Sequence, residues 1–362
     1  MKSLVFSVTN DLSFDQRMQR ICKSLALAGY NVSLVGRKLP ASRPLIPLSF
    51  KQKRLKCFFT KGKLMYAEFN LRLFLHLLFA KADLFCAIDL DTILPVYFAS
   101  KLRDVKRVYD AHELFTEQKE IVTRPSIQKM WLTIEKFAVP KFLEGYTVNN
   151  FIAEEFKRRY GVYYSIVRNL PRLNSEPQIQ QTKPPFIIYQ GAVNEGRSFE
   201  TLVPAMAAVN AKLVVCGEGN FFQKLKDLIA EHDVANKIEL KGFVSPMELA
   251  MLTPKAHIAV MLFENTGLNQ YYSLANRFFD YIMAGVPQVC VDFPEYKVLN
   301  DQYNIAYMIP DTHSKTIANA LNNLLNDAVL YNILKENCLK AREALNWENE
   351  EKVLTAFYKA LW

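Results

Sequence analysis

The sequence predicts an α/β protein of two domains, each built on a parallel β-sheet. The length of 362 residues, at about 150 residues per domain, is enough for two domains with separate cores. Half of the residues are hydrophobic and 22% are charged, with only 12 Gly and 16 Pro, which excludes disordered, collagen-like and low-complexity proteins. A strand, a helix and a second strand follow one another in both halves of the chain, and this alternation is typical of parallel sheets.

The first half opens with a strand–helix–strand unit. An apolar run at 4–8 predicts a strand. The next segment has apolar residues at three- and four-residue spacings between Met18 and Leu27, which predicts a helix that ends at Gly29. The apolar run at 32–35 predicts the second strand, and the short connections imply that the two strands are parallel.

The second half repeats this alternation. Strands are predicted at 186–189, 213–216, 238–240 and 288–291, and helices near 199–209 and 221–229. From about residue 314 to 362, helical spacing predicts two or three helices. Residues 169–185 are polar, rich in Pro and Gln and without apolar periodicity, so we expect an interdomain linker there.

Charge and cysteine content limit the partners and the compartment. Lys and Arg exceed Asp and Glu by 45 to 36, a surplus that favours nucleic acid, phosphorylated metabolites or an acidic membrane face. The six cysteines include no close pair, so neither a zinc site nor a disulfide framework is expected, and a reducing cytoplasm fits best. The N-terminus lacks a signal-peptide pattern, and no apolar stretch reaches the roughly 18 residues that a spanning helix needs.

The basic surplus is concentrated in one segment. From Arg37 to Lys63 there are nine basic residues and no acidic one, and the apolar segment 64–80 follows directly with Glu68, Arg72 and His76 on one helical face. This pattern indicates peripheral contact with an anionic membrane surface. Alternatively, the helix is a core helix and the basic run a solvated loop. Nucleic acid is not expected as a partner, because no nucleic-acid-binding motif accompanies the aromatic residues here.

Two glycine turns are candidate phosphate sites. The loop that begins at Gly191 follows a predicted strand and precedes a helix, so its backbone N–H groups and Arg197 could face an anion. Gly217, Glu218 and Gly219 form a second turn of this kind. Either could instead be an ordinary tight turn.

Two further segments carry groups suited to chemistry. Arg277 and Asp280 lie three residues apart, hence on one helical face, where the arginine could neutralise a diphosphate and the carboxylate could accept from ribose hydroxyls. The alternative is a surface ion pair. In the first half, His112 follows a predicted strand between Asp110 and Glu113, at the sheet edge where α/β proteins place active sites. The alternative is a satisfied core or capping histidine.

Together these segments resemble the retaining, nucleotide-sugar-dependent glycosyltransferases of GT-B fold, in the group called family four or glycosyl transferases group 1. The resemblance extends over nearly the whole chain, and its last segment is the most specific: 15–17, 83–92, 108–113, 191–197, 217–219 and 273–287. It implies two Rossmann-like parallel-sheet domains facing a cleft. The acceptor-side domain would span about 1–170 and the donor domain about 185–340, with a C-terminal helix in 341–362 that returns to the first domain.

The resemblance also assigns roles to residues. Arg197 stands where these enzymes have a lysine on the donor diphosphate, and Arg277 replaces a second lysine. Asp280 stands in place of the glutamate that holds the donor ribose, and His112 matches the active-site histidine near the donor sugar and the acceptor. The predicted catalytic residues are therefore His112, Arg197 and Arg277. The predicted donor-binding residues are Gly191, Arg197, Gly217, Glu218, Gly219, Ser273, Asn276, Arg277 and Asp280.

Three places depart from the family pattern, and in one of them the N-terminal glycine-rich loop is replaced by residues 9–12. Ala192 stands where an arginine usually follows the glycine, so one diphosphate cation is missing and Arg277 is expected to compensate. Tyr272 occupies the position of an acidic residue eight before Asp280.

The resemblance implies transfer of a sugar from a nucleoside-diphosphate sugar to a glycan or lipid-linked acceptor. The reaction would retain configuration, use no metal or cofactor, and serve cell-surface polysaccharide or glycolipid synthesis. Arg197 and Arg277 would stabilise the departing diphosphate in place of a divalent cation. Two alternatives are a sugar-nucleotide epimerase of the same fold and a non-catalytic subunit that binds polyanions or a partner protein.

Overall fold

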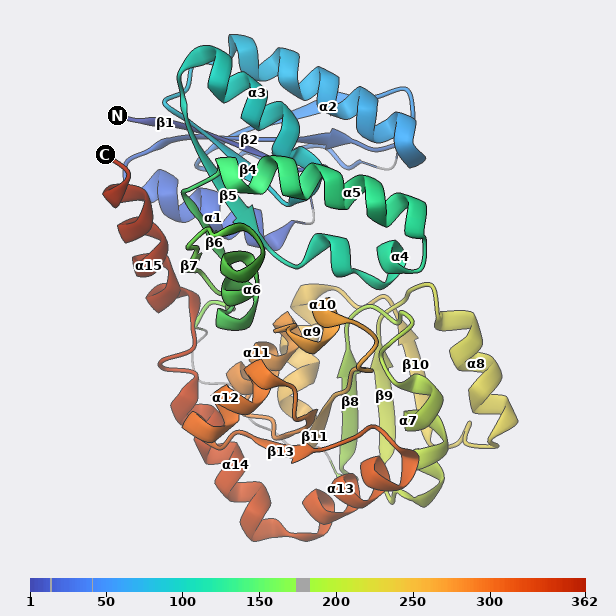
Figure 1. Ribbon diagram of the computed structural model, residues 1–362. Helices are drawn as coiled ribbons and strands as arrows, with labels where there is room; N and C mark the ends of the chain where they lie inside the picture. Colours follow the sequence, from blue (N-terminus) through green and yellow to red (C-terminus); the bar gives the residue numbers. More distant parts are fainter. Residues whose placement is uncertain (14, 41, 174–182) are drawn as a thin grey trace. The chain divides into compact units, whose positions relative to one another are not determined.

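The computed structural model describes residues 1–13, 15–40, 42–173 and 183–362 (Figure 1). These residues form two compact units, one of Met1–Asn169 with Glu350–Trp362 and the other of Leu170–Asn349. Most of the linker predicted at 169–185 lies outside the described residues. Each unit has its own parallel sheet, which confirms the prediction of two parallel-sheet α/β domains.

The first unit contains a seven-stranded sheet in the order β3-β2-β1-β4-β5-β6-β7. All neighbouring strands are parallel. The strands are β1 (Ser3–Ser7), β2 (Asn31–Lys38), β3 (Lys51–Lys56), β4 (Leu84–Ile88), β5 (Lys106–Ala111), β6 (Gly145–Thr147) and β7 (Ser165–Ile166). β4 is buried along its whole length, as expected for a central strand of a sheet covered on both faces.

Seven helices of the described residues belong wholly or largely to this unit. They are α1 (Gln16–Leu27), α2 (Gly62–Phe79), α3 (Ile93–Arg103), α4 (Lys119–Val122), α5 (Pro125–Ala138), α6 (Asn150–Tyr160) and most of α15 (Trp347–Ala360). Local caps define the start of two of them, because Asp15 accepts from the Met18 amide and Asn149 accepts from the Ile152 amide. Tyr358 of α15 packs its ring against Phe6, 5.9 Å between centroids.

The basic segment contains a strand that the sequence did not indicate. β3 is an edge strand, paired in parallel with β2. Its charged composition conceals it, because four of its six residues are Lys or Arg and one face is exposed. The carboxylate of Glu68 on α2 accepts from the backbone amides of Phe58 and Phe59 and from Arg72, which fixes the end of the basic segment against α2. The solvated-loop alternative is therefore wrong for 51–56.

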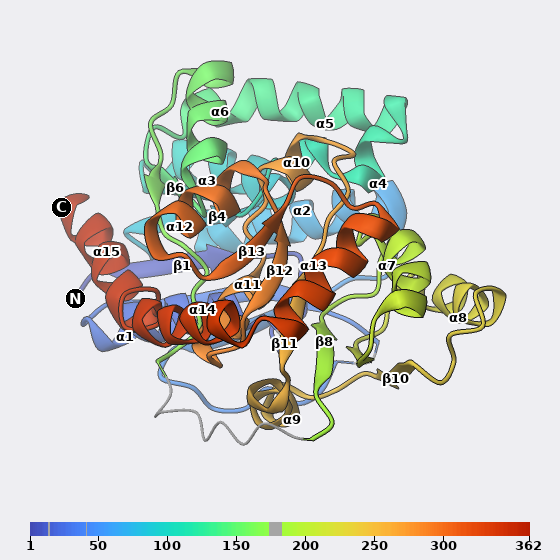
Figure 2. The ribbon, with the colours of Figure 1, turned by 90° about the horizontal axis from the view of Figure 1, so that it is seen from below.

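The second unit contains a six-stranded parallel sheet in the order β10-β9-β8-β11-β12-β13. The strands are β8 (Phe186–Gln190), β9 (Lys212–Cys216), β10 (Ile238–Gly242), β11 (Ile258–Met261), β12 (Gln288–Val291) and β13 (Ala306–Ile309). The helices are α7 (Phe199–Ala205), α8 (Phe222–Glu231), α9 (Pro246–Leu252), α10 (Leu268–Tyr271), α11 (Asn276–Met283), α12 (Pro294–Tyr303), α13 (Ser314–Asn326) and α14 (Ala328–Ala341). α14 packs against α11 and α13 (Figure 2). Among the described residues, no helix is both long enough and apolar enough to cross a bilayer.

Both sheets reverse their direction of growth at one point. In the first unit the chain builds outward from β1 through β2 and β3 and then restarts at β4 on the other side of β1. In the second unit it builds from β8 through β9 and β10 and restarts at β11 beside β8. Open α/β sheets bind ligands outside the carboxyl ends of the strands at such a point, which directs attention to the loops after β1 and β4 and after β8 and β11.

Candidate active site

The loops after β8 and β9 pack backbone against backbone. The Gly191 amide donates to the Cys216 carbonyl at 2.9 Å. Gly217 has φ +150°, and a Cβ there would lie 1.8 Å from the Gly191 carbonyl oxygen, so only glycine fits. A Cβ on Gly219 would lie 2.3 Å from the Val193 carbonyl oxygen. The predicted glycines therefore serve this close contact at the carboxyl end of the sheet.

Glu218 connects the same loops to the end of β10. Its carboxylate accepts from the Phe243 amide at 3.4 Å, and the Gly217 amide donates to the Gly242 carbonyl at 2.7 Å. The Glu218 side chain thus binds the backbone just after β10.

Arg277 lies in the first turn of α11 and is almost wholly buried, at 8% exposure. Its guanidinium lies 4.8 Å from the ring centroid of Tyr189, and Nη1 donates to the Tyr189 hydroxyl at 3.4 Å. A Cβ on Gly191 would lie 3.3 Å from the same Nη1, so the arginine reaches the glycine loop. Nη2 is buried and has no hydrogen-bond partner among the described residues. A buried cation with an unused donor is suited to an anionic ligand.

A second arginine shares an aromatic ring with Arg277. The guanidinium of Arg197 lies 4.3 Å from the ring centroid of Phe263, which follows β11, and that of Arg277 lies 4.8 Å from the same centroid. Each contact with the ring face is favourable for a cation. Two cations therefore lie near one ring, and a bound anion would be attracted to both.

The carboxylate of Asp280 is held by the end of β8. The Gln190 side chain donates to Asp280 at 3.1 Å and accepts from the Thr253 hydroxyl at 2.6 Å, which fixes the orientation of both groups. Asn276 is the first residue of α11, which has no side-chain cap at Ala275.

Two other residues of the predicted site region have partners within the second unit. The Ser273 hydroxyl lies 3.4 Å from the Tyr296 hydroxyl, which also accepts from the Ala275 amide. The Tyr272 ring packs against Tyr271, 5.4 Å between centroids. At the position where the resemblance predicts an acid, this chain therefore has an aromatic contact.

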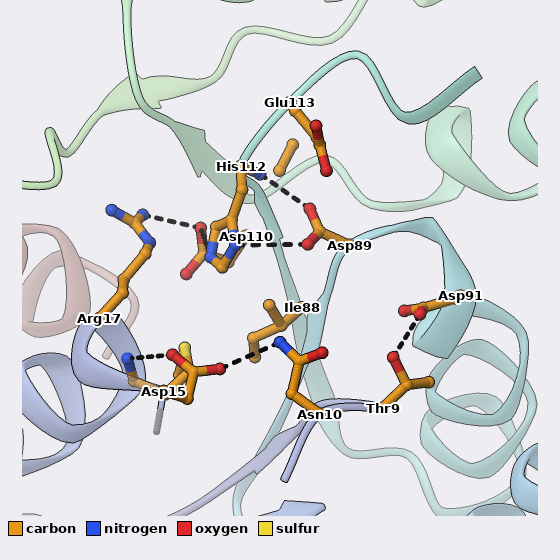
Figure 3. A network of polar contacts seen from close by, with 12 residues as sticks. Thr9, Asn10, Asp15, Arg17, Ile88, Asp89, Asp91, Asp110, His112 and Glu113 are labelled. Carbon is orange, nitrogen blue, oxygen red and sulfur yellow. Dashed lines mark hydrogen bonds and ion pairs between the residues drawn. The ribbon is translucent and has the colours of Figure 1, made fainter. Parts of the chain in front are cut away.

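In the first unit, His112 lies between two carboxylates, as Figure 3 shows. Its Nδ1 is 3.3 Å from Asp89 and its Nε2 is 3.3 Å from Asp110, while its backbone amide donates to Asp89 at 3.0 Å. Burial acts to lower the pKa of His112, but the two carboxylates outweigh it and raise the pKa from 6.5 to about 10. The raised pKa favours the protonated imidazole at neutral pH.

Asp110 also pairs with Arg17 of α1. The Arg17 Nη2 atom is 2.9 Å from the Asp110 carboxylate, and both side chains are buried (Figure 3). Burial acts to raise the pKa of Asp110, but the charges of Arg17 and His112 outweigh it and lower that pKa. Arg17, Asp110, His112 and Asp89 therefore form a network of alternating charges at the ends of β4 and β5.

A cavity of about 420 Å³ opens beside this network at the ends of β1 and β4. Its walls include the carboxylates of Asp89, Asp91 and Glu113 and the cations of Lys63 and Arg124. Burial, assisted by the charge of Asp89, raises the pKa of Asp91 to about 7. The volume lies within the range of small-molecule sites, about 300–1,000 Å³.

Comparison with known proteins identifies the family. Residues 172–341 match the family model described as glycosyl transferases group 1. Residues 172–341 thus carry the glycosyl transferases group 1 match, and the chain is a glycosyltransferase of GT-B fold. A search of curated proteins found no match.

Solved structures of the same fold align with this glycosyltransferase over all or nearly all of its length. Sucrose-phosphate synthase (tll1590) from Thermosynechococcus elongatus is 17% identical, with a TM-score of 0.79 over 100% of this chain and 99% of that one. Anabaena Alr3699/HepE in complex with UDP and glucose is 12% identical, with a TM-score of 0.75 over 100% and 99%. WaaG, a glycosyltransferase involved in lipopolysaccharide biosynthesis, is 14% identical, with a TM-score of 0.72 over 98% and 99%.

The predicted site residues of the glycosyltransferase fall into two groups. The residues predicted to bind the donor all lie in the second unit, where Gly191, Gly217 and Arg277 are in close contact. His112 lies in the first unit. The assigned roles remain predictions.

Several residues of the two clusters were not among the predicted site residues. Asp89 and Asp91 come just after β4, which pairs with β5, the strand before His112. Ligand-binding residues of α/β sheets lie at the carboxyl ends of the strands, so this position was the signal that could have identified them. Gln190 and Phe263 carry no charge and give no such signal.

The histidine network predicts a pH dependence of stability. Because the pKa of His112 is raised in the folded glycosyltransferase, its stabilising effect is complete below about pH 6.5 and is lost as the pH rises through about 10. The difference in free energy of unfolding between the wild type and His112→Gln should therefore shrink over this interval. Urea denaturation at several pH values measures it. A difference that stays constant from pH 6.5 to 10 would contradict the charged state of His112.

Proposed function

We propose that this glycosyltransferase transfers a sugar from a nucleoside-diphosphate sugar to an acceptor hydroxyl with retention of configuration. One observation carries the donor assignment: the guanidinium groups of Arg197 and Arg277 lie on the same ring of Phe263, at the switch point of the second sheet. A diphosphate is the leaving group of such a donor, and its negative charge would attract it to both guanidinium groups. That some neighbours were solved with UDP or UDP-glucose supports the same assignment.

Arg197 and Arg277 would act on the leaving group. As the glycosidic bond breaks, negative charge accumulates on the departing diphosphate, and two positioned guanidinium groups stabilise it electrostatically. They would take the place of a divalent cation, so that no metal is needed. Arg277 would also compensate for Ala192, because it reaches Gly191 directly before that position.

Asp280 would hold the donor ribose. A carboxylate accepts from two neighbouring hydroxyls, and Gln190 keeps this one in a fixed orientation. Ser273 and Asn276 would complete the donor site at the start of α11, and Gly217, Glu218 and Gly219 would shape the wall for the base. His112 would position the sugar or the acceptor as a charged donor of hydrogen bonds.

The acceptor would be a glycan or a lipid-linked sugar in cell-surface polysaccharide or glycolipid synthesis, on the cytoplasmic side of a membrane. Two neighbours, WaaB and WaaG, are named for the lipopolysaccharide outer core and lipopolysaccharide biosynthesis. The edge strand β3 presents Lys51, Lys53 and Lys56 to solvent, and Phe58 beyond it is 85% exposed. Basic groups beside an exposed aromatic ring suit an anionic membrane surface.

Thermal stabilisation by nucleotides tests the donor assignment. UDP, GDP, ADP, CMP and their common sugar conjugates are added in turn, and a ligand at 100 times its Kd should stabilise the fold by about 2.7 kcal/mol. A shift with one diphosphate series supports the proposal and identifies the base. No shift with any of them contradicts it. Analysis of the sugar after incubation without acceptor separates a transferase from an epimerase.

Flotation with vesicles of phosphatidylcholine and phosphatidylglycerol tests the membrane contact. Binding at low salt that is lost at high salt supports it, and each surface lysine replaced by alanine should weaken binding about fivefold. No binding at low salt would contradict the membrane contact, and the acceptor would then be a soluble glycan.

A further inference from the structure

Two cavities of different chemistry adjoin in the first unit. The polar cavity at the ends of β1 and β4 adjoins an apolar groove of about 390 Å³. Five residues line both: Lys63, Tyr66, Asp91, Met130 and Trp131. A ligand with a polar part and an apolar part could therefore contact both cavities.

The groove is formed by apolar side chains of three helices. They include Leu71 and Phe74 of α2, Leu94 and Phe98 of α3, and Ile134 of α5. Among the described residues that line it, the ionisable ones are Lys63, Tyr66 and Asp91, and all three belong to the shared boundary. Leu71 is 60% exposed and Phe98 44% exposed, so the apolar surface is open to an occupant.

The polar cavity has the chemistry of a sugar site. Carboxylates such as Asp89 and Glu113 accept from hydroxyl groups, and the residues that line the cavity include the aromatic Phe115 and Trp131. Lys63 lies at the boundary with the groove, where its ammonium group would meet an anionic group between a sugar and an apolar chain.

We infer that the groove binds the apolar chain of a lipid-linked sugar acceptor. The sugar lies in the polar cavity, the phosphate that joins it to the lipid lies at Lys63, and the hydrocarbon chain lies along Leu71, Phe74 and Phe98. The inference rests on the proposed function for the role of acceptor. It commits the acceptor to one class, since a free soluble glycan would use the polar cavity alone.

Chain-length dependence of binding tests the groove. Alkyl β-D-glucosides from butyl to decyl are titrated below their micelle concentrations, with the fluorescence of Trp131 as the signal and Trp131→Phe to assign it. Each methylene that the groove buries should lower Kd by up to about fourfold. Leu71→Asp places a charge in the groove and should remove most of this dependence.

Leu75→Asp is the matched control. Leu75 lies one turn further along α2, is 48% exposed and does not line the groove, so its variant should keep the chain-length dependence. Equal loss in both variants would show nonspecific adsorption to α2 and overturn the inference. In a parallel titration, Lys63→Ala should weaken octyl phosphate by about tenfold and leave octyl glucoside nearly unchanged. If Leu71→Asp fails to fold, Ala67→Trp fills the groove from an exposed position of the same helix.

The test separates this inference from the proposed function. Nucleotide stabilisation reports on the second unit, whereas alkyl glucosides report on the first. If nucleotides stabilise the protein but the affinity for alkyl glucosides does not depend on chain length, the groove inference is overturned and the donor assignment is not. Chain-length dependence without any nucleotide effect would support the groove and contradict the donor assignment.

Discussion

Arg277→Ala is expected to lower turnover by about 10²–10³-fold, and Arg197→Ala by about 10²-fold or more. Both guanidinium groups would stabilise charge that develops on the leaving diphosphate, and removal of one such donor costs about this much. Arg277 has the larger expected effect because it is buried and its Nη2 atom has no partner among the described residues. Steady-state kinetics with the donor found by thermal stabilisation measures both effects.

Three further variants give this prediction its controls. Arg277→Lys and Arg197→Lys keep the positive charge without the planar donor geometry and should retain part of the activity. Lys226→Ala removes an exposed cation of α8, 5.0 Å from the ring of Phe222, that is not among the predicted site residues and should leave turnover unchanged. Thermal denaturation of each variant shows whether it is folded. Unchanged turnover in a folded Arg197→Ala or Arg277→Ala enzyme would remove that arginine from the leaving-group role.

Asp110→Ala is expected to reduce the free energy of unfolding by about 3–5 kcal/mol. The substitution leaves Arg17 buried without its carboxylate partner and takes one of two carboxylates from His112, and an uncompensated buried charge has a cost of this size. Urea denaturation followed by circular dichroism measures the change.

Glu154→Ala is the control for the buried pair. Glu154 forms an exposed ion pair with Lys157, at 3.4 Å, and its loss should change the free energy of unfolding by no more than about 1 kcal/mol. A similar small change for Asp110→Ala would show that the buried network does not stabilise the first unit.

The sequence predicted those parts of the fold that depend on local patterns. Continuous apolar runs such as 186–189 and 213–216 marked central strands correctly, because these strands are buried on both faces of a parallel sheet. The edge strand β3 was missed, since its pairing with β2 overrides the poor strand propensity of a lysine-rich segment.

The same distinction applies to the candidate site. Glycines and charged residues after predicted strands could be found one by one, and Arg277 and Asp280 were predicted on one helix, where α11 has them. The pairing of Arg197 with Arg277 through Phe263 could not be found, because it joins three segments far apart in the chain. Likewise, the length of α2 was indicated, but the groove beside it depends on how α3 and α5 pack against it.

The division of α15 between the two units has a consequence for biosynthesis. Glu350–Trp362 completes the first unit, where Glu350 accepts from the Arg168 amide and Tyr358 packs on Phe6 and Tyr146. These residues leave the ribosome only after the whole of Leu170–Asn349. During translation the rings of Phe6 and Tyr146 therefore lack their contact with Tyr358 until the second unit has been synthesised. In that interval the nascent chain exposes an aromatic surface to which chaperones can bind.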